Sequence, residues 1–575
     1  MKKAIPVVIA IVLIIVVAAA GFGAKLLEKY SYSKERADLT EYFGVTGSDD
    51  VPIILQDERI EEHARLWDGV CYFDLATVHK YFNDRFYEDK KEGLLLYALP
   101  DQVVRTQIGT NTLTRDVIAH GVPAITQGGE EETREYVIAR YEGDVLYIAA
   151  DYVKEYANYS YELFTDPNRM QVYTEWNERQ VAVIAKDTQV RYQGGIKSDI
   201  LTDVEKGDEV IILEEMENWT KVKTKDAFIG YVENKKLEGQ RTQMPIPVTD
   251  YEEPVYEANT RDYKINMAWH GVGSVEGNET LDAMLAQTKS VNVISPTWFT
   301  LVGNQGDFSS FATQSYVDKA HEKGLEVWAL VGNVESVDVD MYEVLAGTTN
   351  RTHLIDGLIN TALEYNLDGL NIDFENISLD AGEPFIEFIR ELSIPCREHG
   401  IVLSVDNYVP MDHTDHYNRA EQGLVADYVV IMGYDEHYGG SKEAGSVASI
   451  DFVEKGIANT VEQVPAEKVI NGIPFYTRIW ETAGTNVSSQ AVGMEKAQEY
   501  IAEHGITTRW DEETCQNYGE YQSADGFCQV WLEDDESIRV KLNIMQKYEI
   551  AGVAEWKLGF EVSSVWDVIE EYMNQ

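Results

Sequence analysis

The feature that most constrains the fold is a regular alternation of strand-like and helical stretches from Asp262 to Gln575. Residues 385–392, for example, place apolar side chains on one helical face between two strand-like runs. Repeated strand–helix units predict an α/β fold, a parallel (β/α)8 TIM barrel, with its chemistry at the C-terminal ends of the strands. The eight strand-like runs are residues 263–269, 291–295, 326–331, 369–374, 401–405, 428–432, 469–473 and 551–556.

The fourth of these runs carries an unusual set of polar residues. Residues 368–375 read Asp-Gly-Leu-Asn-Ile-Asp-Phe-Glu. Side chains alternate along a strand, so Asn371, Asp373 and Glu375 share one face, and the apolar residues between them share the other. In a barrel the apolar face packs on helices and the polar face points inward, where burial is unfavourable unless the groups are paired or used. The competing interpretation is a half-solvated strand with ordinary alternation, and the barrel context favours a site.

Composition excludes several classes of protein. The 575 residues include 99 Asp plus Glu and 48 Lys plus Arg, a formal charge of −51. That balance argues against a nucleic acid partner, because phosphate binding needs a basic surface. With 44% hydrophobic and 11% aromatic residues the chain is not globally disordered.

The four cysteines are too few for a disulfide-dense scaffold, and their spacing does not suggest a zinc site. Cys515 and Cys528 are separated by 13 positions in the last part of the chain. A disulfide between them and a pair of free thiols are both compatible with the sequence.

The N-terminus predicts a location. Lys2 and Lys3 precede an uncharged run over residues 4–24, about the length of a membrane-spanning helix. Basic residues before the run favour a single-pass transmembrane anchor in the cell membrane, with the acidic body extracellular. The alternative is a cleaved signal peptide, because Ala18-Ala19-Ala20 resembles a small-residue cleavage site, and the protein would then be secreted.

Small β-rich domains are expected between this segment and the barrel. Residues 51–178 contain short strand-like runs separated by turns, and resemble the small N-terminal stalk domain of copper amine oxidases. Residues 181–238 resemble a bacterial SH3-like barrel, through a Lys-Gly-Asp turn, a Trp-x-x-Val strand and a Gly-Tyr-Val strand. Residues 239–261 hold three prolines among polar residues and predict a semi-rigid linker.

Four motifs in the barrel region resemble the family 18 glycoside hydrolases, the chitinase-like family. They are Asp-Gly-x-x-x-Asp-x-Glu at 368–375, Met-Gly-Tyr-Asp at 432–435, the run at 472–478 and Glu-Trp at 555–556. The resemblance implies an α+β insertion before the eighth strand, at about residues 480–550. Asn371 stands where many members have a third Asp, and with the segment 530–534 it resembles the branch that acts on spores and cell walls.

The resemblance also implies roles for single residues. Glu375 is expected to be the general acid, and Asp373 to orient the substrate's 2-acetamido group, which attacks the anomeric carbon in place of an enzyme nucleophile. Tyr434 is expected to hold the acetamido oxygen. The resemblance implies no metal or organic cofactor. The expected substrate-binding residues are Asn371, Met432, Asp435, Tyr476, Arg478 and Trp556.

The expected partner is a glycan polymer that contains N-acetylglucosamine. Peptidoglycan is favoured by the spore and cell-wall resemblance and by the SH3-like module, while chitin and N-glycans are alternatives. A sugar-binding surface protein without catalysis is the alternative of a different class. Retention of Glu375 favours the enzyme, because sugar-binding members of such families typically lose the acid.

Overall fold

The computed structural model describes residues 5–117, 129–247 and 249–575. The chain forms two compact units. The first consists of Met1–Phe86, Ile108–Asn111 and Arg134–Glu253, and the second of Tyr87–Gln107, Thr112–Thr133 and Pro254–Gln575. The range 51–178 therefore contributes to both units.

The first unit begins with helix α1 (Ile5–Tyr30), which continues past the end of the predicted anchor at residue 24. Within the described residues, no helix combines the length and the apolar character that crossing a membrane requires. The expectation of a transmembrane helix at 4–24 is thus not supported, and Ala4 lies outside the described residues.

Two β-sheets build the body of the first unit. In spatial order, the first sheet contains β11 (Ser160–Phe164), β12 (Arg169–Tyr173), β1 (Asp50–Leu55), β2 (Glu58–Trp67), β3 (Val70–Asp74), β10 (Val145–Ala149) and β9 (Ala139–Glu142). The second contains β15 (Ile200–Val204), β14 (Thr188–Arg191), β18 (Ile229–Glu233), β17 (Trp219–Lys223), β16 (Glu209–Glu215), β13 (Arg179–Ile184) and β19 (Leu237–Gln243). Helices α2 (Leu39–Phe43), α3 (Leu75–Tyr81) and α4 (Ala150–Val153) complete the unit.

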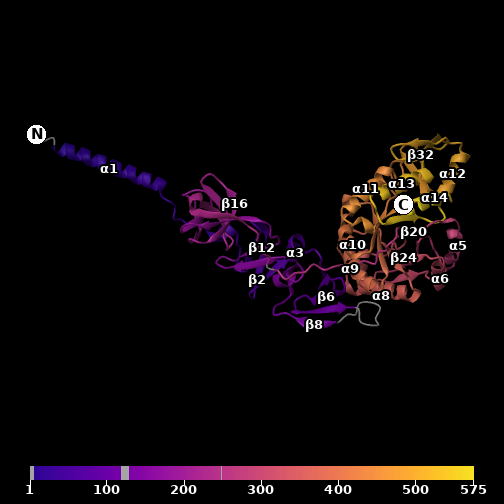
Figure 1. Ribbon diagram of the computed structural model, residues 1–575, viewed down its shortest axis with the longest axis horizontal. Coiled ribbons are helices and arrows are strands. Elements are labelled where there is room, and N and C mark those ends of the chain that lie inside the picture. Colours follow the sequence, from indigo (N-terminus) through magenta and orange to yellow (C-terminus); the bar gives the residue numbers. More distant parts are fainter. Residues whose placement is uncertain (1–4, 118–128, 248) are drawn as a thin grey trace. The chain divides into compact units, whose positions relative to one another are not determined.

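A closed barrel of eight parallel strands forms the centre of the second unit (Figure 1). All eight predicted runs are confirmed as its strands, with no end shifted by more than three residues. The strands are β20 (Ile265–His270), β21 (Val293–Pro296), β24 (Glu326–Gly332), β25 (Gly369–Asp373), β26 (Val402–Tyr408), β27 (Tyr428–Met432), β28 (Val469–Pro474) and β34 (Gly552–Trp556).

Helices surround the barrel because the outer face of each strand is apolar. Phe374, at the end of β25, packs on Phe388 of α9 with ring centroids 5.6 Å apart. The helices are α5 (Leu281–Met284), α6 (Gln314–Glu322), α7 (Met341–Leu345), α8 (Thr348–Tyr365), α9 (Gly382–His399), α10 (Arg419–Val425), α11 (Ile450–Val461), α13 (Asp535–Lys547) and α14 (Val565–Met573). A hairpin of β22 (Phe299–Leu301) and β23 (Phe308–Ser310) follows β21.

An α+β lobe precedes the eighth strand. It ends earlier than the predicted boundary near residue 550, because α13 belongs to the helical layer of the barrel. Its members are β29 (Tyr476–Ala483), β30 (Asn486–Gly493), α12 (Met494–Glu503), β31 (Arg509–Asp511), β32 (Gln516–Gln522) and β33 (Phe527–Leu532).

The strand pairing in the lobe determines whether its two cysteines can form a disulfide. Cys528 on β33 lies opposite Tyr521 on β32, six residues along the chain from Cys515. At about 3.3 Å per residue that is roughly 20 Å, far beyond the 7 Å that a disulfide allows between Cα atoms. Both are free thiols. Of the two possibilities that the sequence left open, the disulfide is therefore wrong.

A five-stranded antiparallel sheet completes the second unit. Tyr87 donates a hydrogen bond to the carbonyl of Ala346 at 2.8 Å, and its ring lies beside the guanidinium of Arg351. Leu96 and Val103 pack with Ile394 of α9. The strands are β4 (Phe86–Asp89), β5 (Leu94–Ala98), β6 (Gln102–Gln107), β7 (Thr112–Val117) and β8 (Glu130–Thr133).

Candidate active site

Strand β25 delivers the predicted polar residues to one end of the barrel. Asn371 is fully buried, Asp373 is 9% exposed, and Glu375 is half-buried two residues beyond the end of the strand. The alternation along the strand keeps all three on the inner face.

Glu375 is held from two neighbouring strands. Tyr408, the last residue of β26, donates a hydrogen bond to Glu375 Oε2 at 2.7 Å. Asn333, just after β24, bonds the Glu375 backbone twice, accepting from its N–H at 2.8 Å and donating to its carbonyl at 2.9 Å. The backbone pair fixes the point from which the carboxyl projects.

Electrostatics favour a protonated Glu375. Burial raises the pKa of this carboxyl, the Tyr408 hydrogen bond lowers it, and the charge of Asp435 raises it again. The net pKa is raised, as a general acid near neutral pH requires.

Asp373 lies deeper than Glu375. Its Oδ1 is buried and has no hydrogen-bond partner among the residues that the structure describes. Burial, followed by the charge of Glu375, raises the pKa of Asp373 to about 8. A buried carboxyl oxygen without a partner costs free energy unless a ligand supplies one, and an N–H group fits that need.

Asn371 is held by four hydrogen bonds from three neighbouring strands, β20, β21 and β26. Its Oδ1 accepts from Trp269 Nε1 at 2.9 Å and from Ser295 Oγ at 3.2 Å. Its Nδ2 donates to Ser404 Oγ at 3.0 Å and to Asp406 Oδ1 at 2.7 Å. This side chain therefore organises the barrel interior beneath Asp373.

Tyr434 and Asp435, which follow the end of β27, form the next part of the site. Tyr434 is nearly buried, and Tyr476 from β29 donates to Asp435 Oδ1 at 2.5 Å. The rings of Tyr434 and Tyr476 meet edge to face at 6.2 Å. Gly472 makes room for this arrangement, because a Cβ there would lie 3.0 Å from Tyr434 Cε1.

The remaining predicted residues lie at the rim and in the lobe. Trp556 ends β34, is half-buried, and meets Trp269 edge to face at 5.6 Å. Met432 ends β27 and is half-buried. Arg478 on β29 donates to Ser489 Oγ at 3.0 Å, within the lobe sheet.

Asp406, Tyr408 and Asn333 take part in the site and were missed in the sequence. The predicted fifth strand stopped at 405, whereas β26 continues to Tyr408. The signal was present, because the alternation that places Ser404 inward also places Asp406 and Tyr408 inward. For Asn333 no pattern in the sequence gave a signal.

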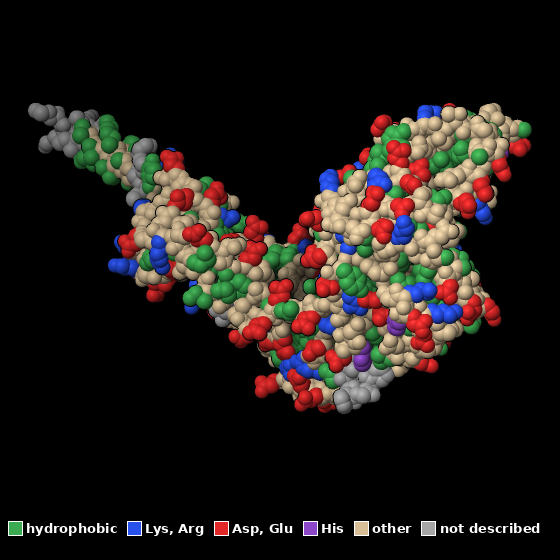
Figure 2. All heavy atoms as spheres, turned by 45° about the vertical axis from the view of Figure 1, so that its right-hand side comes forward, with side chains coloured by type: hydrophobic (Ala, Val, Ile, Leu, Met, Phe, Trp, Pro, Cys, Tyr) green, Lys and Arg blue, Asp and Glu red, His purple; other side chains and the backbone are tan. Residues whose placement is uncertain are grey.

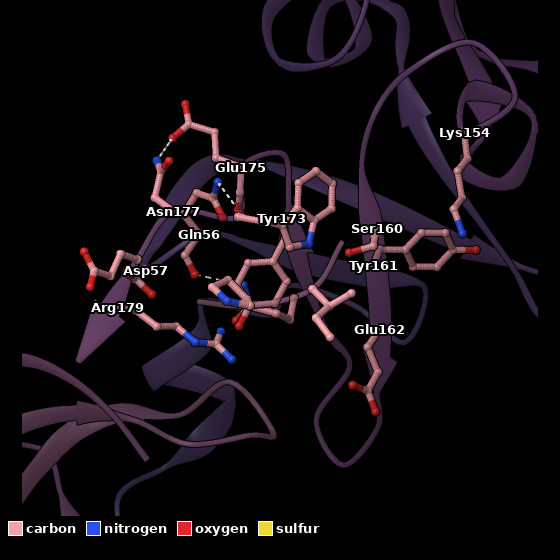
Figure 3. Close-up of a pocket in the computed structure, with 15 residues that line it drawn as sticks. Gln56, Asp57, Lys154, Ser160, Tyr161, Glu162, Tyr173, Glu175, Asn177 and Arg179 are labelled. Carbon is pink, nitrogen blue, oxygen red and sulfur yellow. Dashed lines mark hydrogen bonds between the residues drawn. The ribbon is translucent and has the colours of Figure 1, made fainter. Parts of the chain in front are cut away.

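A separate cavity of about 520 Å³ lies in the first unit, where Figure 3 shows Tyr161, Tyr173, Lys154 and Arg179 in its wall. The carboxyl side chains that line it are exposed, whereas Asp373 and Glu375 of the barrel are buried or half-buried. They are Asp57, Glu162, Glu175 and Glu178. The acid–base chemistry is assigned to the barrel.

The parallel barrel places an acid of raised pKa beside a second buried carboxyl, an arrangement that suits general acid catalysis. Residues 263–561 match the family described as "Glycosyl hydrolases family 18", and residues 186–238 match "Bacterial SH3 domain". The chain belongs to glycoside hydrolase family 18.

Known proteins are similar to part of the chain. A putative sporulation-specific glycosylase, YdhD of Bacillus subtilis, is 30% identical over 231 residues, 38% of this chain and 53% of the relative. A cortical fragment-lytic enzyme of B. subtilis is 25% identical over 242 residues, 40% of this chain and 56% of the relative. The chain thus spans about half the length of these two relatives.

Among solved structures, the C-terminal domain of a putative chitinase from Desulfitobacterium hafniense aligns with a TM-score of 0.50 and 22% identity. The alignment covers 55% of this chain and 99% of that domain. This similarity supports the barrel fold.

Proposed function

We propose that the barrel hydrolyses a polymer containing β-linked N-acetylglucosamine, with net retention of configuration, through the substrate's own acetamido group. The observation that carries this proposal is the pairing of two acids: Glu375 has a raised pKa, and the buried Oδ1 of Asp373 has no hydrogen-bond partner among the described residues. Substrate-assisted retention needs one proton donor and one group that orients the acetamide.

In this proposal Glu375 protonates the glycosidic oxygen as the bond to the anomeric carbon breaks. The acetamido oxygen attacks that carbon and forms a cyclic oxazolinium, which water then opens. Asp373 accepts the acetamide N–H and stabilises its developing positive charge, and Tyr434 donates to the acetamido oxygen. Asp435 is held by Tyr476 beside this group, and Trp556 supplies an apolar surface under the sugar ring.

We infer that peptidoglycan is the polymer, cleaved after N-acetylglucosamine. The names of the two relatives, one sporulation-specific and one cortical fragment-lytic, support this choice, as does the bacterial SH3 domain. Chitin is the second candidate, because the aligned structure is described as a putative chitinase domain.

The test compares the protein with its Glu375→Gln variant on purified sacculi, chitin oligomers and N-glycans. The products are reduced with borohydride and read by mass spectrometry. We expect wild type to release peptidoglycan fragments with a reduced N-acetylglucosamine end. The variant should be slower by about 10²–10⁴-fold, because it lacks the proton donor, yet still bind the glycan.

Intact sacculi beside digested chitin would reject peptidoglycan. Equal rates for wild type and variant would remove Glu375 from the mechanism. Binding without turnover by wild type would favour the non-catalytic sugar-binding alternative.

We further propose that the body of the protein acts outside the cytoplasm. The basic pair and the uncharged N-terminal run support this location. Cell fractionation with N-terminal sequencing of the mature protein tests it. Recovery of the uncleaved chain in the cytoplasmic fraction would contradict it.

A further inference from the structure

Asp406 is a buried acid of the barrel interior that the proposed mechanism does not use. It lies on β26 and is 2% exposed. Strands β25 and β26 are parallel, with Ile372 opposite Val405, so Asp373 lies beside Asp406 one residue further on. Neighbouring strands are about 4.8 Å apart, and both side chains point into the barrel.

Asn371 connects this acid to the site. Its Nδ2 donates to Asp406 Oδ1 at 2.7 Å. Its Oδ1 accepts hydrogen bonds from Trp269 on β20 and Ser295 on β21, which hold the side chain in place. The orientation of the Asp406 carboxyl is therefore determined by the same residue that lies beneath Asp373.

The surroundings of Asp406 oppose a second negative charge. Asp373 and Glu375 act on it from β25 and the following loop, and both are acids. Tyr408 lies on its own strand, and Tyr434 reaches it from the end of β27 with Asp435 and Tyr476 behind. Arg478 is a cation of the described residues near this group, and it acts on Tyr476.

Burial first, and then the charge of Asp373, raise the pKa of Asp406 well above its ordinary range, with the Asn371 hydrogen bond opposing them. Two adjacent buried carboxyls cannot both ionise readily, so they share one proton. The more deeply buried member, Asp406, is the better place for it.

We propose that Asp406 is a positioning residue for Asp373: it holds the proton of the pair, so that Asp373 meets the substrate as a carboxylate. This assignment rests on the proposed function. The proton is transferred within the pair, from the Asp373 oxygen to the Asp406 oxygen, and none is gained from or lost to water. Asp373 is then free to accept the acetamide N–H.

Two substitutions of Asp406 test whether its side chain acts as a neutral hydrogen-bond donor, as an anion or only as a structural residue. Asp406→Asn keeps the volume and supplies a permanent neutral donor. Asp406→Val keeps most of the volume, suits a strand, and removes the donor. Ser404→Ala is the control, because it removes the other acceptor of Asn371 and carries no charge.

The first readout is the pH profile of kcat/KM on an N-acetylglucosamine oligomer. In Asp406→Val the proton stays on Asp373 to higher pH, so the acidic limb moves up by about one unit, and activity below that limb falls about tenfold. The limb of Asp406→Asn stays near that of wild type, and Ser404→Ala does not move it. An acidic limb of Asp406→Val at the wild-type pH overturns the proposal. An acidic limb of Asp406→Asn at the pH found for Asp406→Val also overturns it.

The second readout needs no substrate and so stands apart from the proposed function. Infrared titration of ¹³C-aspartate-labelled protein, in a Glu375→Gln background and taken as a difference against the same protein with Asp373→Asn, isolates the ionisation of Asp373. We expect the carboxylate band of Asp373 to appear at lower pH in the protein that keeps Asp406 and in Asp406→Asn. In Asp406→Val the band should appear at higher pH. The same onset in all three overturns the proposal even if the protein cleaves the glycan. The expected order supports it even if the polymer has been misidentified.

Discussion

Glu375 shows how single neighbours determine the strength of an acid. Its burial favours the protonated form, the hydroxyl of Tyr408 favours the ionised form, and the charge of Asp435 again favours the protonated form. Because burial is the largest of these contributions, the tyrosine tempers the acid and also holds it in position.

Tyr408→Phe should raise the pKa of Glu375 further, because it removes a donor to the carboxylate and leaves burial unchanged. A general acid acts in its protonated form, so the basic limb of the kcat/KM profile should move to higher pH by about one unit. The profile between pH 5 and 10 is the measurement.

Tyr417→Phe is the matched control. Tyr417 is buried next to Tyr408, with ring centroids 5.9 Å apart, and its hydroxyl bonds the backbone at Ile377 and not the Glu375 carboxyl. The basic limb of the kcat/KM profile of Tyr417→Phe should stay at the wild-type pH. A basic limb of Tyr408→Phe at lower pH would contradict the role of Tyr408 as a hydrogen-bond donor to Glu375.

At the scale of elements, helix α8 depends on a strand far from it in sequence. Its N-cap residue, Gly347, offers no side-chain acceptor. Instead Asp89 of β4 accepts from the backbone N–H of Thr348 at 2.7 Å and from its hydroxyl at 2.6 Å. Glu92 accepts from the N–H of Thr349 at 2.6 Å. The small sheet thus caps a helix of the barrel.

Asp89→Ala should lower the free energy of unfolding of the second unit by about 1–2 kcal/mol, since it leaves a buried helix terminus without its cap. Denaturant titration of the full chain, followed by barrel tryptophan fluorescence, measures the change. Asp101→Ala, at an exposed acid in the turn between β5 and β6, is the control and should stay within about 0.5 kcal/mol of wild type. Equal effects of the two substitutions would contradict the capping role.

A buried ion pair joins the lobe to the helical layer. Lys541 of α13 lies 2.9 Å from Glu533, which follows β33, and both are almost fully buried. Gln516 and Ser537 donate to the same carboxylate at 2.7 Å. The charge of Glu533 is therefore compensated only while the lobe and α13 stay together.

Lys541→Met should destabilise the protein by about 3–5 kcal/mol, because it leaves Glu533 buried without its cation. The double variant Glu533→Gln/Lys541→Met should recover part of that loss, since it removes both charges. Thermal unfolding of the two variants against wild type is the measurement. A double variant less stable than the single one would show that the charges themselves stabilise the fold.

At the scale of the whole molecule, the four cysteines are separated by the fold. Cys71, Cys396 and Cys528 are buried, Cys515 is half-buried, and all four are free. Alkylation after unfolding without reductant should therefore add four labels by intact mass. Two labels would indicate a disulfide that this structure excludes.

The charge of −51 also belongs to the whole molecule. Figure 2 shows acidic side chains scattered over the visible face and not gathered in one patch. Repulsion between this charge and anionic polymers is screened beyond a Debye length of about 8 Å, so the charge by itself does not exclude the proposed wall glycan.

The sequence by itself determined the eight barrel strands, their order and the inward face of Asn371, Asp373 and Glu375. Strand alternation is local, with a period of two residues, and can be read without knowing what lies alongside. The family motifs are likewise short segments at strand ends.

Only the tertiary structure decided which residues surround that face. Tyr408 reaches Glu375, and Asp406 reaches Asn371, because closing the barrel brings strand ends 33 and 35 residues apart into hydrogen-bond distance. Asp89 caps α8 from 259 residues away, and the register of β32 and β33 keeps Cys515 from Cys528. Such contacts depend on how strands pair and elements pack, which a local pattern does not encode.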